Sequence, residues 1–112
     1  MQQPEYIVVF VTANTSGEAQ RIAALLLEQR QAACVNIIPE VESRFWWEGK
    51  IDSARESLLI IKTRASLLPE IIRRVKEVHS ETVPEIIALP VFGGNQEYLG
   101  WIGKETAQGP RK

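Results

Sequence analysis

The sequence predicts an α+β fold: a ferredoxin-like β-α-β-β-α-β sandwich followed by a short C-terminal helix. Two observations predict it. Short runs rich in β-branched and apolar residues alternate with longer segments whose apolar residues recur at helical spacing. In addition, only a tight turn separates the two middle strands, so they form a hairpin, while helices join the outer pairs. Two right-handed β-α-β crossovers on one antiparallel sheet satisfy both observations.

The composition is that of one small globular domain. The chain has 112 residues, of which 45% are hydrophobic and 24% charged. We expect one domain over residues 1–112, with its core at about residues 6–103 and a polar, frayed tail at residues 108–112. The formal net charge of -1 gives no positive field to recruit nucleic acid, and no apolar run is long enough to span a bilayer. We therefore expect neither nucleic acid nor a membrane as a partner.

The N-terminal residues and the cysteine content predict a cytoplasmic protein. The chain does not open with a basic region followed by an apolar stretch, so no signal peptide is expected. Cys34 is the only cysteine, which excludes an intramolecular disulfide and is compatible with a reducing compartment.

The first strand and helix follow from one continuous stretch. Residues 6–12, YIVVFVT, predict a buried strand. Thr15 and Glu18 have the spacing of a capping box, in which a hydroxyl and a carboxylate satisfy free amides at the start of a helix. The helix is expected to run to about Gln31 because apolar residues follow at helical spacing: Ala19, Ile22, Ala23, Leu26 and Leu27.

Residues 34–63 predict a long β-hairpin whose arms exceed the usual strand length. Pro39 removes one amide donor from the first arm and should interrupt its ladder. The chain turns at Glu48 and Gly49, and the second arm follows over residues 50–63.

The remaining elements are a helix, a strand and a final helix. The second helix is expected to start near Ser66, whose hydroxyl can cap it, with Pro69 in the first turn and His79 at the end. Residues 85–90 predict the fourth strand, and residues 98–107 a short helix. The residues expected to face inward from this last helix are Tyr98, Trp101 and Ile102.

His79 is the only histidine, and two interpretations of it stay open. At the end of a helix, a cationic imidazole interacts favourably with the helix dipole and the last carbonyls. Alternatively, His79 is one ligand of a soft or borderline metal, aided by Cys34 or Glu85. For Cys34 itself, packing as a small hydrophobe is favoured over a catalytic thiolate, because no neighbour that would lower its pKa is evident.

Adjacent tryptophans predict self-association. Trp46 and Trp47 must point to opposite faces of a strand, and the two crossover helices cover only one face of the sheet. At least one indole is therefore exposed unless the last helix or another subunit covers it, and exposed aromatic area usually marks an interface. The long hairpin also leaves strand edges open to pairing.

Two charged residues of the second hairpin arm share a face. Glu56 and Lys62 are six residues apart, so they line a cleft as a pair or flank the hydrophobic core in solvent. The solvated interpretation is favoured for Glu56, and Lys62 is the better candidate for a polar group in a pocket. Neither a phosphate-binding loop nor a zinc pattern of paired cysteines is present.

Several short stretches, taken together and in order, resemble the CutA family of divalent-cation tolerance proteins over about residues 6–103. They are ACVNIIP at 33–39, WEGK at 47–50, ESLLIIKT at 56–63, His79 followed by PEI at 84–86, ALP at 88–90, GN at 94–95 and YLGW at 98–101. The resemblance implies a homotrimer of ferredoxin-like protomers, topologically similar to PII signalling proteins. It also implies that strands of neighbouring subunits pair edge to edge and that the hairpin arms reach across.

The resemblance implies a role in tolerance to copper and other divalent metals, with metal binding and no enzymatic reaction. By position, His79 matches the family's histidine after the second helix, and Cys34 matches its cysteine in the second strand. The positions expected to line the cleft between subunits are Trp47, Glu56, Lys62, Tyr98 and Trp101.

The chain also departs from the family pattern. Ser80 and Glu81 stand where the family commonly has Pro-Tyr, and Val11 and Val78 stand where some members have a cysteine and a histidine. These changes remove soft ligands. We therefore expect weak or inter-subunit binding of Cu(II) or another divalent cation by a cytoplasmic trimer. The alternative is a PII-like signalling or scaffold trimer that binds a small anionic metabolite or a partner protein between subunits.

Overall fold

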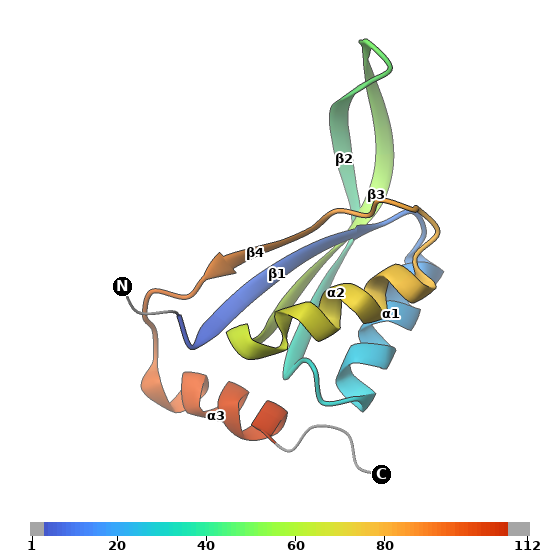
Figure 1. The fold of residues 1–112 in the computed structure, drawn as a ribbon. Coiled ribbons are helices and arrows are strands. Elements are labelled where there is room, and N and C mark those ends of the chain that lie inside the picture. The colour runs from blue at the N-terminus through green and yellow to red at the C-terminus, as the bar shows by residue number, and fades with distance from the viewer. Residues whose placement is uncertain (1–3, 108–112) are drawn as a thin grey trace.

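The computed structural model describes residues 4–107 and has the predicted order of elements (Figure 1). The elements are β1 (Tyr6–Ala13), α1 (Ser16–Glu28), β2 (Cys34–Trp47), β3 (Lys50–Arg64), a 3-10 turn (Ala65–Leu67), α2 (Leu68–Val78), β4 (Ile86–Pro90) and α3 (Gln96–Ala107). The four strands form one antiparallel sheet in the order β2-β3-β1-β4. This topology confirms the predicted α+β class. The expected tail at residues 108–112 lies outside the described residues.

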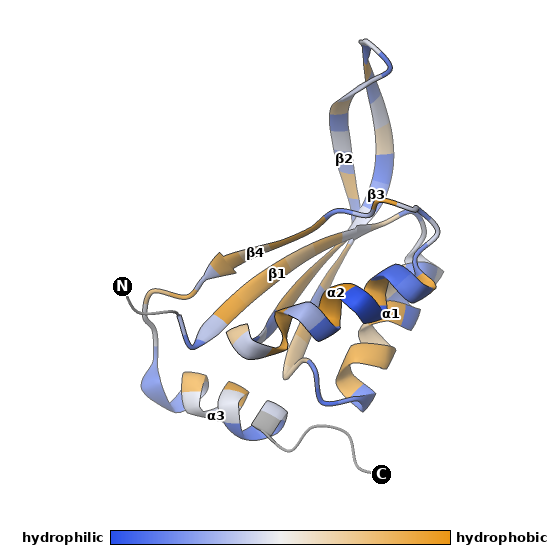
Figure 2. Cartoon of the chain, in the orientation of Figure 1, coloured by the Kyte–Doolittle hydropathy of each residue, from blue (hydrophilic) through white to orange (hydrophobic). Residues whose placement is uncertain are grey.

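One face of the sheet forms the hydrophobic core with α1 and α2 (Figure 1). Alternate residues of β1 and β3 are buried on this face, and each fully buried aliphatic side chain contributes about 1.5–3 kcal/mol to stability. The fully buried members of the core include Val9, Val11, Ile22, Leu26, Leu59, Ile61, Ile71 and Val75. The hydropathy colouring shows apolar strands in the body of the sheet and mixed ones in the projecting hairpin (Figure 2).

The opposite face of the sheet is apolar and only partly covered. Val8, Phe10 and Ile60 lie on this face and are half-buried, whereas Ile87 and Leu89 of β4 are exposed. Apolar area of this kind is typical of an interface. Association with another subunit stays a prediction.

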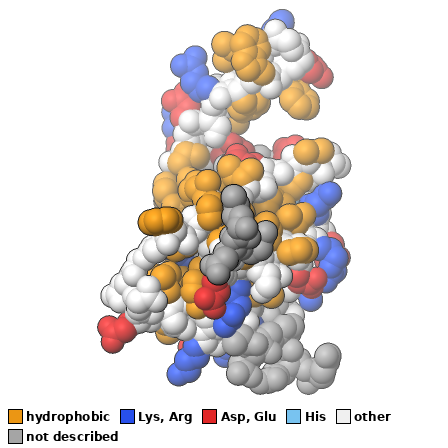
Figure 3. Space-filling view, turned by 60° about the vertical axis from the view of Figure 1, so that its left-hand side comes forward, with side chains coloured by type: hydrophobic (Ala, Val, Ile, Leu, Met, Phe, Trp, Pro, Cys, Tyr) orange, Lys and Arg blue, Asp and Glu red, His pale blue; other side chains and the backbone are white. Residues whose placement is uncertain are grey.

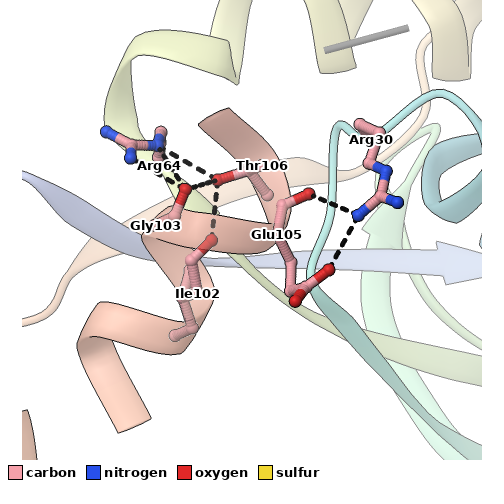
Figure 4. A network of polar contacts seen from close by, with 6 residues as sticks. All are labelled: Arg30, Arg64, Ile102, Gly103, Glu105 and Thr106. Carbon is pink, nitrogen blue, oxygen red and sulfur yellow. Dashed lines mark hydrogen bonds and ion pairs between the residues drawn. The ribbon is translucent and has the colours of Figure 1, made fainter. Parts of the chain in front are cut away.

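A network of polar contacts attaches α3 to one end of the sheet (Figure 4). The Arg64 guanidinium donates to the carbonyl of Gly103, at 2.8 Å from Nη2, and to the hydroxyl of Thr106, at 3.1 Å from Nε. A Cβ atom on Gly103 would lie 2.7 Å from the hydroxyl of Tyr6, so a glycine permits this close approach. The helix is thus held by partly buried hydrogen bonds from Arg64 and not only by apolar packing.

The inward face of α3 differs from the prediction. Ile102 is buried as expected, but Tyr98 and Trp101 are 43% and 40% exposed. Their rings pack on each other, with centroids 5.4 Å apart. The reason is that α3 packs on the sheet through Ile102, Gly103 and Thr106, so the larger aromatic rings remain at the edge of the contact.

The hairpin of β2 and β3 projects well beyond the body of the protein (Figure 1). The predicted interruption at Pro39 is confirmed as a register shift between Ile38 and Val41, after which the strand continues. Glu48 and Gly49 both have positive φ values, 50° and 79°, as a two-residue hairpin turn of type I′ requires.

Three predicted helix boundaries are off by two or three residues, and one of them is the start of α3, which lies at Gln96 instead of Tyr98. α1 ends at Glu28, and Arg30 adopts a left-handed conformation (φ 59°) that stops the helix before Gln31. α2 begins at Leu68, and no side chain caps it, because Ser66 lies in the preceding 3-10 turn.

Candidate functional site

A concave surface of about 700 Å³ lies where the hairpin leaves the body of the protein; we call it the hairpin groove. Its lining comes from the end of β1, both hairpin arms and the segment between α2 and β4. The titratable side chains along it are Asp52, Glu56, His79, Glu81 and Glu85, and Arg44 is the one lysine or arginine among the lining residues described. In Figure 3, acidic side chains lie in the notch below the hairpin tip, so the groove is negatively charged.

His79 lies at the inner wall of this groove, with its side chain only 2% exposed. Its Nε2 lies 2.7 Å from the carbonyl oxygen of Thr12, and the backbone amide of Glu81 donates to its Nδ1 at 3.0 Å. A carbonyl can only accept a hydrogen bond and an amide N–H can only donate one, so these partners assign a neutral ring with its proton on Nε2. The ring therefore binds the Thr12 carbonyl and the Glu81 amide, and not the last carbonyls of α2 that the sequence suggested.

The carboxylate of Glu18 is buried behind His79, with its side chain 4% exposed. It accepts hydrogen bonds from the backbone amides of Asn14 at 2.9 Å and Ser80 at 2.5 Å. Burial alone would raise the pKa of Glu18, but the hydrogen bonds from Asn14 and Ser80 outweigh it and hold the pKa below its usual value. Glu18 is therefore a buried anion that joins the start of α1 to the end of α2.

The predicted capping box is confirmed in its first half and extended in its second. The amide of Glu18 donates to the hydroxyl of Thr15 at 3.0 Å, as predicted. Its carboxylate, however, binds the amide of Asn14 instead of that of Thr15, and reaches the distant Ser80. This second contact spans 62 positions of sequence, so local spacing contains no signal for it.

The side chain of Asn14 adds a second link to the same segment. Its amide nitrogen Nδ2 donates to the hydroxyl of Ser80 and to the carboxylate of Glu81, both at 2.8 Å. The Glu81 carboxylate is therefore fixed at the rim of the groove. Sequence reasoning missed the roles of Asn14 and Asp52, and it noted Glu81 only as a departure from the family pattern.

A second polar cluster lies at the other end of β3. Cys34 pairs with Lys62 across the two strands, and the Lys62 ammonium lies 3.9 Å from its sulfur and contacts the side-chain oxygen of Asn36. Tyr98 and Trp101 of α3 flank this cluster. Burial, and then the neighbouring Cys34 thiol, raise the pKa of Tyr98.

The structure thus divides the predicted site residues into two groups. Trp47, Glu56, His79 and Glu85 line the hairpin groove, whereas Cys34, Lys62, Tyr98 and Trp101 belong to the second cluster. Glu56 and Lys62 share a face of β3, as predicted, but six residues of extended strand place them about 20 Å apart. Within residues 4–107 of one protomer, no three His, Cys, Asp or Glu side chains are close enough to hold a metal ion together.

Comparison with known proteins identifies the family. The chain matches the family described as CutA1 divalent ion tolerance protein over residues 7–105. The chain belongs to this family. It is 49% identical to the divalent-cation tolerance protein CutA of Archaeoglobus fulgidus, over 84% of the chain and 91% of that relative. It is 48% identical to the chloroplastic CutA 1 of Oryza sativa subsp. japonica, over 91% of the chain. The chain spans only 58% of that rice protein and 55% of the Arabidopsis thaliana one.

Solved structures of CutA proteins share the fold. The CutA1 of Oryza sativa has a TM-score of 0.89 at 48% identity, covering 92% of this chain and 94% of its own. The CutA1 of Shewanella sp. SIB1 has a TM-score of 0.90 at 37% identity, covering 94% and 98%. The family description and the name of the Archaeoglobus fulgidus relative give divalent-cation tolerance, and neither of them names an enzyme activity. Among the helices of the described residues, none is long and apolar enough to cross a membrane.

Proposed function

We propose that the protein acts in divalent-cation tolerance without catalysing a reaction, and that it binds divalent cations weakly in the hairpin groove. The observation that carries this proposal is the charge of the groove, which is lined by four carboxylate residues and one arginine. Carboxylate oxygens are ligands for divalent cations. Of the predicted metal ligands, Glu85 is among the residues that line the groove, whereas His79 has both nitrogens engaged and Cys34 lies in the second cluster.

The proposal includes a homotrimer in which neighbouring subunits complete the site. The apolar open face of the sheet supports association, as do the exposed edge strands β2 and β4 and the exposed tryptophans Trp46 (72%) and Trp47 (60%). Ligands from a second subunit would supplement a groove that lacks three convergent ligands in one protomer. Light scattering should then give three times the mass of one chain. A monomer at micromolar concentration would contradict the assembly.

The predicted cytoplasmic location and the choice of copper stay predictions. Relatives are named chloroplastic in Oryza sativa and periplasmic in Archaeoglobus fulgidus, so the compartment differs among family members. Cu(II) and Zn(II) both accept carboxylate ligands, and both are suitable probes.

Calorimetric titration of the untagged protein with Zn(II) and Cu(II) tests the cation binding. We expect saturable heat that weakens in Glu56→Gln and Glu85→Gln, because each change removes one negative charge from the groove. Glu97→Gln is the matched control, since Glu97 is an exposed carboxylate on α3, outside the residues that line the groove. Absence of saturable heat with either metal would contradict the proposal.

The second cluster favours the alternative, a PII-like trimer that binds a small anionic metabolite. The Lys62 ammonium beside the paired rings of Tyr98 and Trp101 suits an anion with a planar group. Such a ligand raises the melting temperature, and the shift grows with ligand concentration, since it binds the native state. A shift with carboxylate or phosphate metabolites that disappears in Lys62→Met, with no effect of metals, would favour this function.

A further inference from the structure

We propose that His79 is a positioning residue of the hairpin groove that supplies no metal ligand, and that it holds the main chain of Glu81 so that the groove presents carboxylates to a cation. This inference rests on the proposed cation binding for its functional consequence. Its geometric part concerns the free protein and is tested separately.

The first argument is that both ring nitrogens of His79 already have partners. The Glu81 amide donates to Nδ1 at 3.0 Å, and Nε2 donates to the Thr12 carbonyl at 2.7 Å. The side chain is 2% exposed, so a cation has no free access to the ring. Metal binding at Nε2 would displace the contact with Thr12 of β1, and metal binding at Nδ1 would displace the Glu81 amide.

The second argument is that three consecutive residues are fixed by different partners. The ring of His79 is bound to Thr12, the amide of Ser80 to the Glu18 carboxylate at 2.5 Å, and the Glu81 carboxylate to the Nδ2 of Asn14 at 2.8 Å. The contact between the His79 ring and the Glu81 amide closes this set, in the i to i+2 geometry of an Asx-turn. The His79 ring is therefore one of the groups that fix the main chain at Glu81, four residues before Glu85.

The third argument concerns the class of cation. With the imidazole used for backbone contacts and Cys34 in the second cluster, the titratable groups that remain in the groove are carboxylates: Asp52, Glu56, Glu81 and Glu85. Oxygen ligands of this kind suit hard divalent cations such as Mn(II), and they bind Zn(II) or Cu(II) without nitrogen coordination. The ligands that this groove contributes should therefore be oxygen atoms only.

The ligand question is tested by nitrogen NMR on untagged protein labelled with 15N-histidine. Because His79 is the only histidine, its ring gives one unambiguous pair of signals. We expect the neutral Nε2–H tautomer at neutral pH, and no ligation shift of either nitrogen at Zn(II) concentrations that saturate the calorimetric heat. A ligation shift on Nδ1 or Nε2 would overturn the proposal.

Substitutions test the positioning role. We expect His79→Ala to lower the Zn(II) association constant by about tenfold, as loss of an outer partner of a metal ligand does. His79→Asn should restore most of the affinity, because an asparagine oxygen accepts the amide two residues later in the same turn. Thr106→Val is the control: it breaks buried hydrogen bonds in the α3 network, so it should lower the melting temperature and leave the affinity unchanged. Equal losses in His79→Asn and His79→Ala would overturn the role.

Amide exchange in the metal-free protein tests the positioning role of His79 independently of cation binding. We expect the Glu81 amide to be protected in the wild type and in His79→Asn, and to exchange freely in His79→Ala. Equal exchange in the wild type and His79→Ala would overturn the positioning role, whatever the metal titration gives. Absence of Zn(II) heat together with a protected Glu81 amide would contradict the proposed function and leave the positioning role supported.

Discussion

Two polar networks attach peripheral segments to the same sheet, and they use opposite charges. At the hairpin groove, the buried Glu18 carboxylate accepts hydrogen bonds from one backbone amide before α1 and from another after α2. At the other end, the Arg64 guanidinium donates to a backbone carbonyl and a hydroxyl of α3 (Figure 4). The first network borders an open acidic groove, whereas the second attaches α3 to the sheet. Similar hydrogen bonds therefore position a candidate site in one region and only complete the fold in the other.

The largest effect is expected from Glu18→Ala. The change removes two hydrogen bonds to an ionised group and leaves two partly buried amides without an acceptor, so the free energy of unfolding should fall by about 3 kcal/mol. Urea denaturation measures it. Glu77→Ala is the control, because the exposed Glu77 pairs with Arg73 on the helix surface and its loss should cost under about 1 kcal/mol. Equal losses in the two variants would contradict the network at the groove.

Arg64→Met should have the next largest effect. The methionine keeps much of the apolar stem but loses the donors to Gly103 and Thr106, which should lower the free energy of unfolding by about 1.5–3 kcal/mol. We expect amide exchange to increase in α3 and to stay unchanged at residues 79–81. An increase at residues 79–81 as well would show that the two networks are not independent.

A pH titration separates the two networks further. The pKa of Glu18 is lower in the folded protein, so its stabilisation is fully present above the unfolded value of about 4.5 and is lost as pH falls through the folded value. We expect Glu18→Gln to flatten the acid side of the stability curve. Arg64→Met should keep the slope of the wild type, since the guanidinium stays charged throughout. An unchanged acid slope in Glu18→Gln would contradict the lowered pKa.

The same comparison shows what the sequence could predict. Runs rich in β-branched and apolar residues predicted the four strands, and apolar residues at helical spacing predicted the helices, as in the apolar stripe of α1. Thr15 and Glu18 predicted the helix start because their contact is local. The link from Glu18 to Ser80 could not be predicted, because tertiary packing alone brings these residues together.

The candidate site was harder to predict than the fold for a related reason. Sequence spacing places Glu56 and Lys62 on one face of a strand, but it does not reveal that their neighbourhoods belong to different ends of the sheet. For His79, the residue type suggested metal chemistry, while the structure gives both its nitrogens backbone partners. The acidic residues of the groove come from the hairpin and from the segment before β4. These segments are distant in sequence, so only the tertiary fold brings the residues to one surface.

The smallest effect is expected from Arg30→Ala, at the edge of the α3 network. Arg30 donates to the carboxylate of Glu105 at 2.7 Å and to its backbone carbonyl at 3.2 Å (Figure 4), but the two side chains are 47% and 33% exposed. Solvent screening limits such a pair, so the free energy of unfolding should fall by about 0.5 kcal/mol, and less in 1 M salt. Urea denaturation at low and high salt measures the difference. A loss as large as that of Arg64→Met would show that exposed contacts hold α3 as strongly as the buried ones.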